Sequence, residues 1–166
     1  HLGDICELVK KENADLGIVV DPDVDRLALI DEKGEMFGEE YTLVAVADYL
    51  LKHKKGAAIS NLSSSRALRD VAQAHHSEYF ASAVGEVNVV TLMKEKNAVI
   101  GGEGNGGIIY PELHYGRDSL VGVALFLTHL AKENKTVSEL RAGYPGYFMG
   151  KKKIELTPEI DVDAIL

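Results

Sequence analysis

Three aspartates stand at alternate positions in the segment 21–26, whose sequence is Asp-Pro-Asp-Val-Asp-Arg. The segment follows an apolar run, Gly17 to Val20, that is typical of a buried strand. In a curled loop at the end of that strand, the oxygens of Asp21, Asp23 and Asp25 can converge. Carboxylates this close repel one another or take up protons unless a cation pairs with them, and hard divalent ions favour oxygen ligands. The pattern therefore predicts a divalent metal site.

Arg26 directly follows the third aspartate. Its guanidinium cannot lose its charge, so it is equipped to hold a phosphate oxygen beside the metal. Metal and arginine together indicate a site that handles phosphoryl groups.

Two other interpretations of the acidic loop stay open. A calcium-binding EF-hand loop also has Asp at its first, third and fifth positions, and Glu32 falls at the twelfth, but Arg26 stands where that loop requires glycine. The flanking segments also have strand rather than helix patterns. An ordinary surface turn rich in Asp and Pro is the second alternative.

A glycine-rich segment, Gly101 to Gly107, follows a later strand pattern. It contains a formal Gly-x-Gly-x-x-Gly match, but a dinucleotide site needs a helix to begin within the motif, and the segment after it has Pro111 and no helical periodicity. Glycines also let a backbone approach a ligand closely. Glu103 and Asn105 then supply a carboxylate and an amide, which suit the neighbouring hydroxyls of a sugar. A surface loop of the same composition without a ligand is the alternative.

The elements that position these loops alternate between helical and strand patterns. The helices are expected at 2–12, 40–54, 63–74, 86–95 and 118–132, and the strands at 17–20, 26–31, 57–61, 78–82 and 98–101, with a β-hairpin over 26–37 and a further strand at 151–156. Gly56 is expected to cap the second helix in a left-handed conformation. This order predicts the α/β class with a largely parallel or mixed sheet, and a domain boundary near Gly38.

Composition excludes several classes of function. The formal net charge of −8 argues against a nucleic-acid partner, which is held by Lys and Arg. No apolar run reaches the roughly 18 residues of a membrane span, and no signal peptide begins the sequence. The single cysteine, Cys6, lies at an apolar position of a predicted helix and is expected to be a small buried hydrophobe. A cytoplasmic protein is expected.

The acidic and glycine loops together resemble the α-D-phosphohexomutase superfamily, which has an Asp-Gly-Asp-x-Asp-Arg metal loop and a Gly-Glu-x-Ser-Gly sugar loop. The resemblance implies that Asp21, Asp23 and Asp25 bind Mg²⁺ and that Arg26 steadies a phosphoserine. It also implies that Glu103 and Asn105 contact the ring hydroxyls of a hexose phosphate. The implied reaction is transfer of a phosphoryl group between the phosphoserine and the sugar.

The resemblance also implies a domain organisation. Residues 1–38 correspond to the last helix, strand and hairpin of the family's second domain, 39–150 to its third domain, a mixed sheet flanked by helices, and 151–166 to a linker toward a fourth. The phosphoserine loop and the Arg-x-Ser-Gly-Thr phosphate-docking loop do not occur in these residues. The chain is therefore expected to be an interior fragment that is inactive alone.

Two positions depart from the family pattern. Many members have histidine where this chain has Gly107, and many have lysine where it has Glu86. The combination of Val-Gly-Glu-Val-Asn, Gly-Glu-Gly-Asn-Gly-Gly and Gly-Arg-Asp is closer to an archaeal-type branch of phosphomannomutases and phosphoglucosamine mutases, which leaves the sugar open. A calcium-stabilised carbohydrate-binding module without catalysis is the alternative function.

Overall fold

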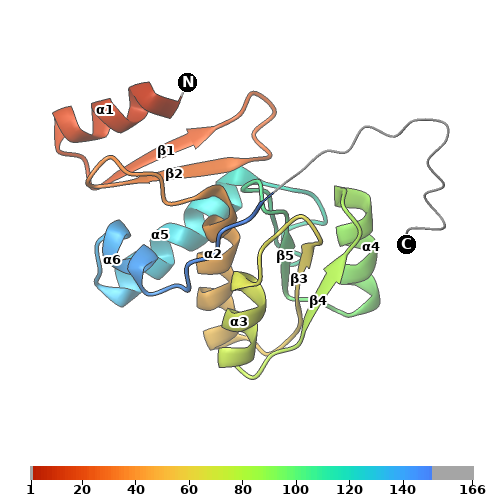
Figure 1. The fold of residues 1–166 in the computed structure, drawn as a ribbon. Helices are drawn as coiled ribbons and strands as arrows, with labels where there is room; N and C mark the ends of the chain where they lie inside the picture. The colour runs from red at the N-terminus through yellow and green to blue at the C-terminus, as the bar shows by residue number, and fades with distance from the viewer. Residues whose placement is uncertain (1, 151–166) are drawn as a thin grey trace.

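The computed structural model describes residues 2–150, in which helices and strands alternate along most of the chain (Figure 1). The predicted strand at 151–156 and the predicted linker 151–166 lie outside the described residues. In chain order the elements are α1 (Leu2–Glu12), β1 (Leu16–Val20), β2 (Leu27–Asp31), α2 (Glu39–His53), β3 (Ala58–Asn61), α3 (Ala67–Ala74), β4 (Tyr79–Ser82), α4 (Glu86–Glu95), β5 (Ile100–Gly102), β6 (Ile108–Ile109), α5 (Ser119–Glu133) and α6 (Val137–Ala142).

The strands form two sheets. In the first, β1 pairs antiparallel with β2, from Leu16 opposite Asp31 to Val20 opposite Leu27. The second has the order β4-β3-β5-β6, in which β3 is parallel to both β4 and β5, and β6 is antiparallel to β5. Helices α2 and α3 lie on one side of this sheet and α4 on the other (Figure 1). The prediction of an α/β fold with a mixed sheet flanked by helices is confirmed.

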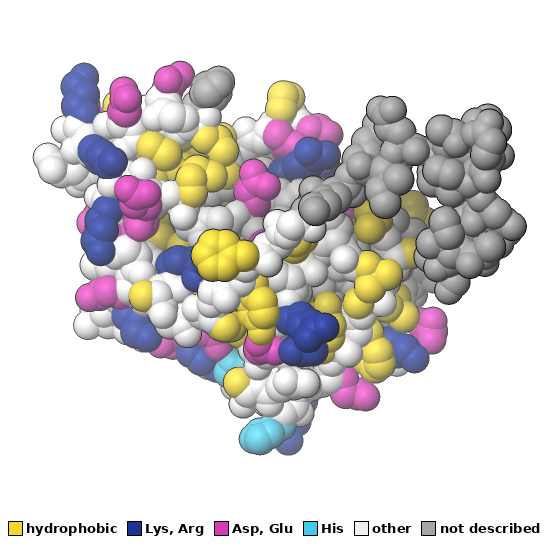
Figure 2. Space-filling model, in the orientation of Figure 1, with side chains coloured by type: hydrophobic (Ala, Val, Ile, Leu, Met, Phe, Trp, Pro, Cys, Tyr) yellow, Lys and Arg dark blue, Asp and Glu magenta, His cyan; other side chains and the backbone are white. Residues whose placement is uncertain are grey.

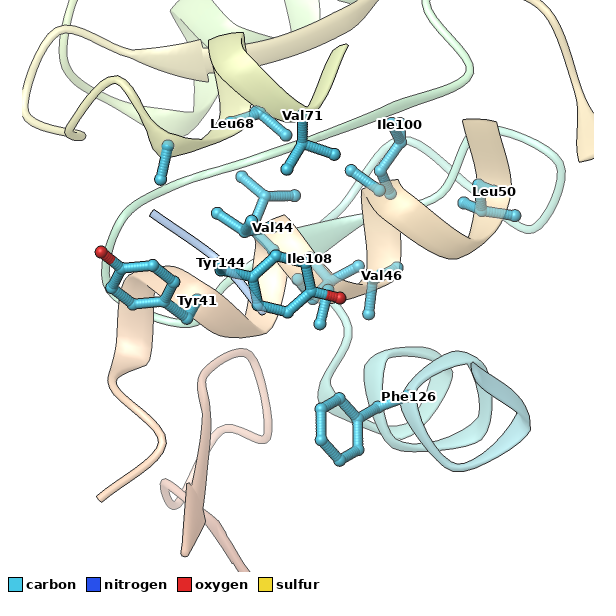
Figure 3. Packing of buried hydrophobic residues seen from close by; sticks show 14 of the residues in the cluster. Tyr41, Val44, Val46, Leu50, Leu68, Val71, Ile100, Ile108, Phe126 and Tyr144 are labelled. Atoms are coloured by element: carbon cyan, nitrogen blue, oxygen red, sulfur yellow. The ribbon is translucent and has the colours of Figure 1, made fainter. Parts of the chain in front are cut away.

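Helix α2 is the centre of the main core. It packs against α3, α5, β2 and β5, so it meets apolar neighbours on several sides. A helix in that position needs apolar residues around most of its circumference, and the run Leu43 to Ala47 is buried without a break. Figure 3 shows Val44 and Val46 of this helix among side chains from other elements, including Phe126 of α5.

The β1-β2 hairpin shares that core. Leu27 and Leu29 of β2, together with Phe37, belong to the same buried cluster as Phe126. The rings of Phe37 and Phe126 meet edge to face with centroids 5.1 Å apart, a preferred geometry for aromatic pairs. Gly38 thus separates two segments of the sequence whose buried side chains form one continuous core, and this packing fixes the acidic loop relative to the larger sheet.

One local prediction was wrong. Gly56 does not cap α2 in a left-handed conformation, because the helix already ends at Lys54 in extended backbone, with φ −140°. Gly56 is instead needed for space, since a Cβ there would lie 2.3 Å from Cγ1 of Val99.

The predicted hairpin over 26–37 is present in short form. An antiparallel bridge joins Ile30 to Met36, and the backbone N–H groups of Asp31 and Phe37 donate to the carbonyls of Glu35 and Leu29, each at 2.9 Å. The other edge of β2 pairs along its length with β1.

Two short elements were not predicted. Strand β6 lies where no strand was expected, and α6 lies where no helix was expected. The signal for α6 was present in the sequence, because Thr136 and Glu139 form a capping box, with each side chain bonded to the backbone N–H of the other. Within residues 2–150, none of the helices combines the length and the apolar character that crossing a membrane requires.

Glu32 fixes α6 to the end of β2, and this contact predicts an acid-sensitive step in stability. Its carboxylate accepts hydrogen bonds from the hydroxyl and from the backbone N–H of Ser138. Burial works against the charged form, but these bonds outweigh it and lower the pKa of Glu32 from 4.5 to about 2. Because the folded-state pKa is depressed, the stabilisation is complete above pH 4.5 and is lost as the pH falls toward 2.

We therefore expect Glu32→Gln to lower the free energy of unfolding by about 1–2 kcal/mol at pH 7 and by less at pH 3. Urea denaturation at the two pH values measures both quantities. Glu7→Gln, an exposed position on α1, is the control and should change neither. An equal loss for Glu32→Gln at both pH values would show that the charged carboxylate is not what stabilises the contact.

Candidate functional site

The acidic loop between β1 and β2 is curled by its own hydrogen bonds. Oδ1 of Asp21 accepts the backbone N–H groups of Asp25 and Arg26, each at 3.1 Å, and the carbonyl of Asp21 accepts the N–H of Val24 at 3.0 Å. Val24 has φ +58°, a left-handed conformation that is strained for a β-branched residue. Its carbonyl is held by the N–H of Ser119, at the start of α5, at 3.1 Å. Local bonds and one helix terminus thus stabilise the curled form.

The three predicted metal ligands converge. One oxygen each from Asp21, Asp23 and Asp25 lies within 4.8 Å of the other two. Oδ1 of Asp25 is buried and has no hydrogen-bond partner among the described residues. A buried polar atom without a partner costs free energy that a ligand would recover. The all-oxygen donor set and the orphaned oxygen both fit a hard divalent cation.

Proton affinities differ between two of these carboxylates. Burial raises the pKa of Asp25; the charge of Arg117 opposes this, whereas the neighbouring carboxylates of Asp21 and Asp23 reinforce it. Burial also acts to raise the pKa of Asp21, but hydrogen bonds from backbone N–H groups, that of Arg26 first, outweigh it and lower the value. The loop therefore concentrates negative charge that a cation would stabilise.

Arg26 lies beside the carboxylates and faces solvent. Its Nε is 3.7 Å from Oδ2 of Asp21 and 3.7 Å from Oδ1 of Asp25, and its side chain is 55% exposed. These separations are longer than a hydrogen bond, so within residues 2–150 most of the donor capacity of the guanidinium is left for an anion.

Glu32 does not approach the acidic loop. It follows the last residue of β2, at the opposite end of that strand, where it bonds Ser138. The elements on either side of the loop are the strands β1 and β2. The EF-hand alternative is therefore wrong, because both the flanking helices and the twelfth ligand are missing.

The glycine loop joins β5 to β6 as a tight antiparallel connection. Gly101 pairs with Ile109, and the backbone N–H of Glu103 donates to the carbonyl of Gly107 at 3.0 Å. No helix begins within the loop, which agrees with the rejection of a dinucleotide site.

The glycine loop contacts β2, the strand that follows the acidic loop, through Gly106. The N–H of Leu27, the first residue of β2, donates to the carbonyl of Gly106 at 3.2 Å. Gly106 has φ +89°, and a Cβ there would lie 2.3 Å from the carbonyl oxygen of Leu27. Only glycine allows the two backbones to come this close.

Glu103 and Asn105 line one small pocket, but Glu103 is less accessible than the sequence predicted. It is only 6% exposed, and its two oxygens accept bonds from Nδ2 of Asn61 at 2.8 Å and from Nη1 of Arg117 at 3.0 Å. Oδ1 of Asn105 accepts the N–H of Gly107 at 3.2 Å, so its amide NH₂ is left to donate. The pocket has a volume of about 210 Å³.

A second hollow of about 210 Å³ is lined by Asp21, Arg26 and the neighbouring part of β2. It shares Glu39 and Asn105 with the first pocket. The acidic loop and the glycine loop, about 80 residues apart in sequence, therefore open onto adjoining hollows. The six site residues predicted from the sequence are all in or beside them.

Arg117 is the functional candidate that sequence reasoning missed. Its guanidinium contacts Asp25 of the acidic loop, Glu103 of the glycine loop and Glu86 at the start of α4. A Cβ on Gly107 would lie 2.5 Å from Cδ of Arg117. Both departures from the family pattern, Glu86 and Gly107, thus adjoin one arginine. No local motif could have shown this, because all the partners are distant in sequence.

Other conspicuous residues lie elsewhere. His75 and His129 both contact Asp48, at 2.6 Å and 3.2 Å, and His129 is fully buried. A cavity of about 640 Å³ lies beside α5 and α6 and is lined by none of the six predicted site residues. On the face shown in Figure 2, acidic and basic side chains are interspersed.

Comparison with known proteins identifies the family to which these segments belong. Residues 38–147 match the family model for the α/β/α domain III of phosphoglucomutase/phosphomannomutase, and residues 1–34 match the model for domain II. The chain is 34% identical over 154 residues to a phosphoglucomutase/phosphomannomutase of Thermococcus kodakarensis, covering 92% of this chain and 34% of that protein. It is 33% identical over 168 residues to a phosphoglucosamine mutase of Aliarcobacter butzleri, covering 99% of this chain and 38% of that protein.

Solved structures share the fold. A phosphoglucomutase/phosphomannomutase family protein of Burkholderia thailandensis superposes with a TM-score of 0.75 at 23% identity, covering 87% of this chain and 32% of that one. The phosphoglucomutase parafusin of Paramecium superposes with a TM-score of 0.69 at 25% identity, covering 84% of this chain and 27% of that one. The chain spans about a third of the length of the curated relatives it matches. With a domain III match over most of its length, the chain belongs to the phosphoglucomutase/phosphomannomutase family.

Proposed function

We propose that the full-length protein transfers a phosphoryl group between an enzyme phosphoserine and a hexose phosphate, and that this chain supplies the Mg²⁺ site and the sugar-recognition loop. The convergence of one oxygen each from Asp21, Asp23 and Asp25 carries the proposal. Its support is the adjoining hollow lined by Arg26 and Asn105, together with relatives named phosphoglucomutase/phosphomannomutase and phosphoglucosamine mutase.

The acidic loop performs the electrostatic part of the reaction. Asp21, Asp23 and Asp25 hold Mg²⁺, which when bound neutralises charge on the transferring phosphoryl group. Arg26, with most of its donors free, binds a phosphate oxygen and orients it beside the loop. Catalysis of phosphoryl transfer depends mainly on such positioning and charge stabilisation.

The glycine loop recognises the sugar. Glu103 has unused acceptor lone pairs beyond its bonds to Asn61 and Arg117, so it can accept from a hydroxyl without breaking them. Asn105, whose oxygen is occupied by the N–H of Gly107, donates its NH₂ to a neighbouring hydroxyl. Together they select a sugar with two adjacent hydroxyls in the correct orientation.

The domain organisation follows from the same proposal. Residues 1–38 form the end of domain 2 with the metal loop, 39–150 form domain 3, and 151–166 lead toward domain 4. The phosphoserine and the phosphate-docking loop come from other parts of a cytoplasmic full-length enzyme, so the 166-residue chain binds ligands but does not turn them over. The alternative of a calcium-stabilised carbohydrate-binding module has no counterpart among the family matches.

Activity of the full-length protein with glucose, mannose and glucosamine phosphates tests the proposal. We expect interconversion of at least one phosphate pair that stops when EDTA removes Mg²⁺ and returns when Mg²⁺ is restored. Failure to interconvert any of these sugar phosphates, with the metal bound and the protein folded, would contradict the proposed function.

Glu103→Gln tests the recognition loop. The substitution keeps the shape of the side chain but removes the charge that accepts from the hydroxyl, so kcat/KM is expected to fall about 10- to 100-fold, mainly through KM. Steady-state kinetics measure both constants. The matched control is Glu95→Gln, at the exposed end of α4, which should leave them unchanged. An unchanged KM for Glu103→Gln would remove Glu103 from the sugar site.

A further inference from the structure

Arg117 is enclosed by three carboxylates from three separate segments. Nε donates to Oε2 of Glu86 at 3.0 Å, Nη1 donates to Oε2 of Glu103 at 3.0 Å, and Nη2 forms an ion pair with Oδ2 of Asp25. The side chain is only 15% exposed. Each nitrogen of the planar guanidinium therefore has its own partner, an arrangement that Lys cannot reproduce with a single ammonium group.

The contact between Arg117 and Asp25 leaves the two carboxylate oxygens of Asp25 in different environments. Oδ2 is taken by Arg117, whereas Oδ1 is buried and has no hydrogen-bond partner among residues 2–150. Only Oδ1 is therefore left for a metal. Mg²⁺ requires near-octahedral geometry with one oxygen from each carboxylate, whereas Ca²⁺ takes 6–8 oxygens and often binds both oxygens of one carboxylate.

The position of Arg117 is fixed from several directions. Its backbone N–H donates to Oε1 of Glu86 at 3.3 Å, and it forms an antiparallel bridge with Ile109 of β6. The missing side chain of Gly107 leaves the space that the arginine stem occupies. Because Glu86 and Glu103 hold the guanidinium, it cannot follow Asp25 if that carboxylate turns to present both oxygens.

We propose that Arg117 is a positioning residue that limits Asp25 to one metal-facing oxygen and thereby makes the acidic loop prefer Mg²⁺ to Ca²⁺. The inference rests on the proposed metal site and goes beyond it, because it assigns the choice of cation to a residue that does not itself bind the metal. Without the arginine, Asp25 is free to turn and to offer both oxygens, which suits the larger ion.

If Arg117 acted on the metal site only through its charge, the outcome would be different. Mg²⁺ and Ca²⁺ carry the same charge, so removing a nearby cation strengthens the binding of both by a similar factor. This effect of charge cancels in the ratio of the dissociation constants for Mg²⁺ and Ca²⁺. A change in the ratio therefore reports the positioning of Asp25 rather than the local charge.

The experiment is calorimetric titration of the full-length protein with Mg²⁺ and, separately, with Ca²⁺. For Arg117→Met we expect the preference for Mg²⁺ over Ca²⁺ to fall about tenfold. Arg117→Lys keeps the charge but cannot hold three carboxylates at once, so its preference should fall in the same direction. Arg69→Met removes an arginine on α3 whose hydrogen bonds and ion pair within residues 2–150 are all with its neighbour Asp70, and it should leave the ratio unchanged.

Circular dichroism shows whether Arg117→Met folds. If it does not fold, Glu86→Gln gives an independent result. It weakens the anchor of Arg117 without touching either loop, and a smaller fall in the preference for Mg²⁺ is expected. An unchanged ratio in the folded Arg117 variants, or in Glu86→Gln where those do not fold, would overturn the positioning role while leaving the metal site intact. No binding of either cation to the unsubstituted protein would overturn the metal site itself and this inference with it.

Discussion

Replacing Asp23 by Asn in the full-length protein is expected to lower kcat by about a thousandfold or more, because the loss of a metal-binding charge removes several kcal/mol of transition-state stabilisation. Asp23 suits this test because it is exposed and makes no hydrogen bond or ion pair with any residue in the described range 2–150. Its substitution therefore removes a proposed metal ligand without removing a contact that holds the fold. Turnover at saturating sugar phosphate and Mg²⁺ gives kcat.

The control for Asp23→Asn is Asp15→Asn. Asp15 is also exposed and lies immediately before β1, at the other end of that strand from the acidic loop. It should have unchanged turnover, and both variants should unfold at the temperature of the unsubstituted protein. Near-normal turnover of Asp23→Asn with Mg²⁺ still bound would exclude Asp23 as a metal ligand.

Gly106→Ala is expected to lower the free energy of unfolding by about 3 kcal/mol, the sum of a strained backbone conformation and a steric overlap. Gly106 has φ +89°, which alanine adopts only at a cost, and its new Cβ would lie 2.3 Å from the carbonyl oxygen of Leu27. That neighbour is backbone in a paired strand, so it cannot move aside as a flexible side chain would. Denaturant unfolding followed by circular dichroism measures the change.

Gly146→Ala is the matched control for this prediction. A Cβ at Gly146 would meet no atom within 4 Å, and this glycine does not have positive φ. The free energy of unfolding should therefore change by no more than about 0.5 kcal/mol. A similarly small effect for Gly106→Ala would mean that the two loops separate easily, and that their contact through Leu27 does not fix the site.

Local patterns predicted much of the fold and part of the site. The periodicity of α1 and α4 gave their bounds, and the triplet Asp21, Asp23 and Asp25 predicted a convergence that the structure confirms. Both results depend on neighbours within a few residues. The hydrogen bonds that curl the acidic loop join Asp21 to residues no more than five positions away, so the sequence of the loop largely determines its shape.

Features set by distant contacts could not be predicted in this way. Gly56 resembled a helix cap, but its role depends on Val99, which approaches it only in the folded chain. Glu103 lines a pocket, but its low exposure could not be foreseen, because it depends on the bonds that its two oxygens accept from Asn61 and Arg117. The position of Arg117 depends on partners 14 and 31 residues away and on the acidic loop. Periodicity and motif spacing contain no information about such pairs.

A crystal structure of the full-length protein grown with Mn²⁺ is the most direct test of the metal site, because Mn²⁺ takes the same oxygen ligands as Mg²⁺ and scatters anomalously. We expect one anomalous peak at coordinating distance from one oxygen of each of Asp21, Asp23 and Asp25, with Oδ2 of Asp25 still paired to Arg117. A map without a peak there, with the three carboxylates turned apart into solvent, would contradict the proposal.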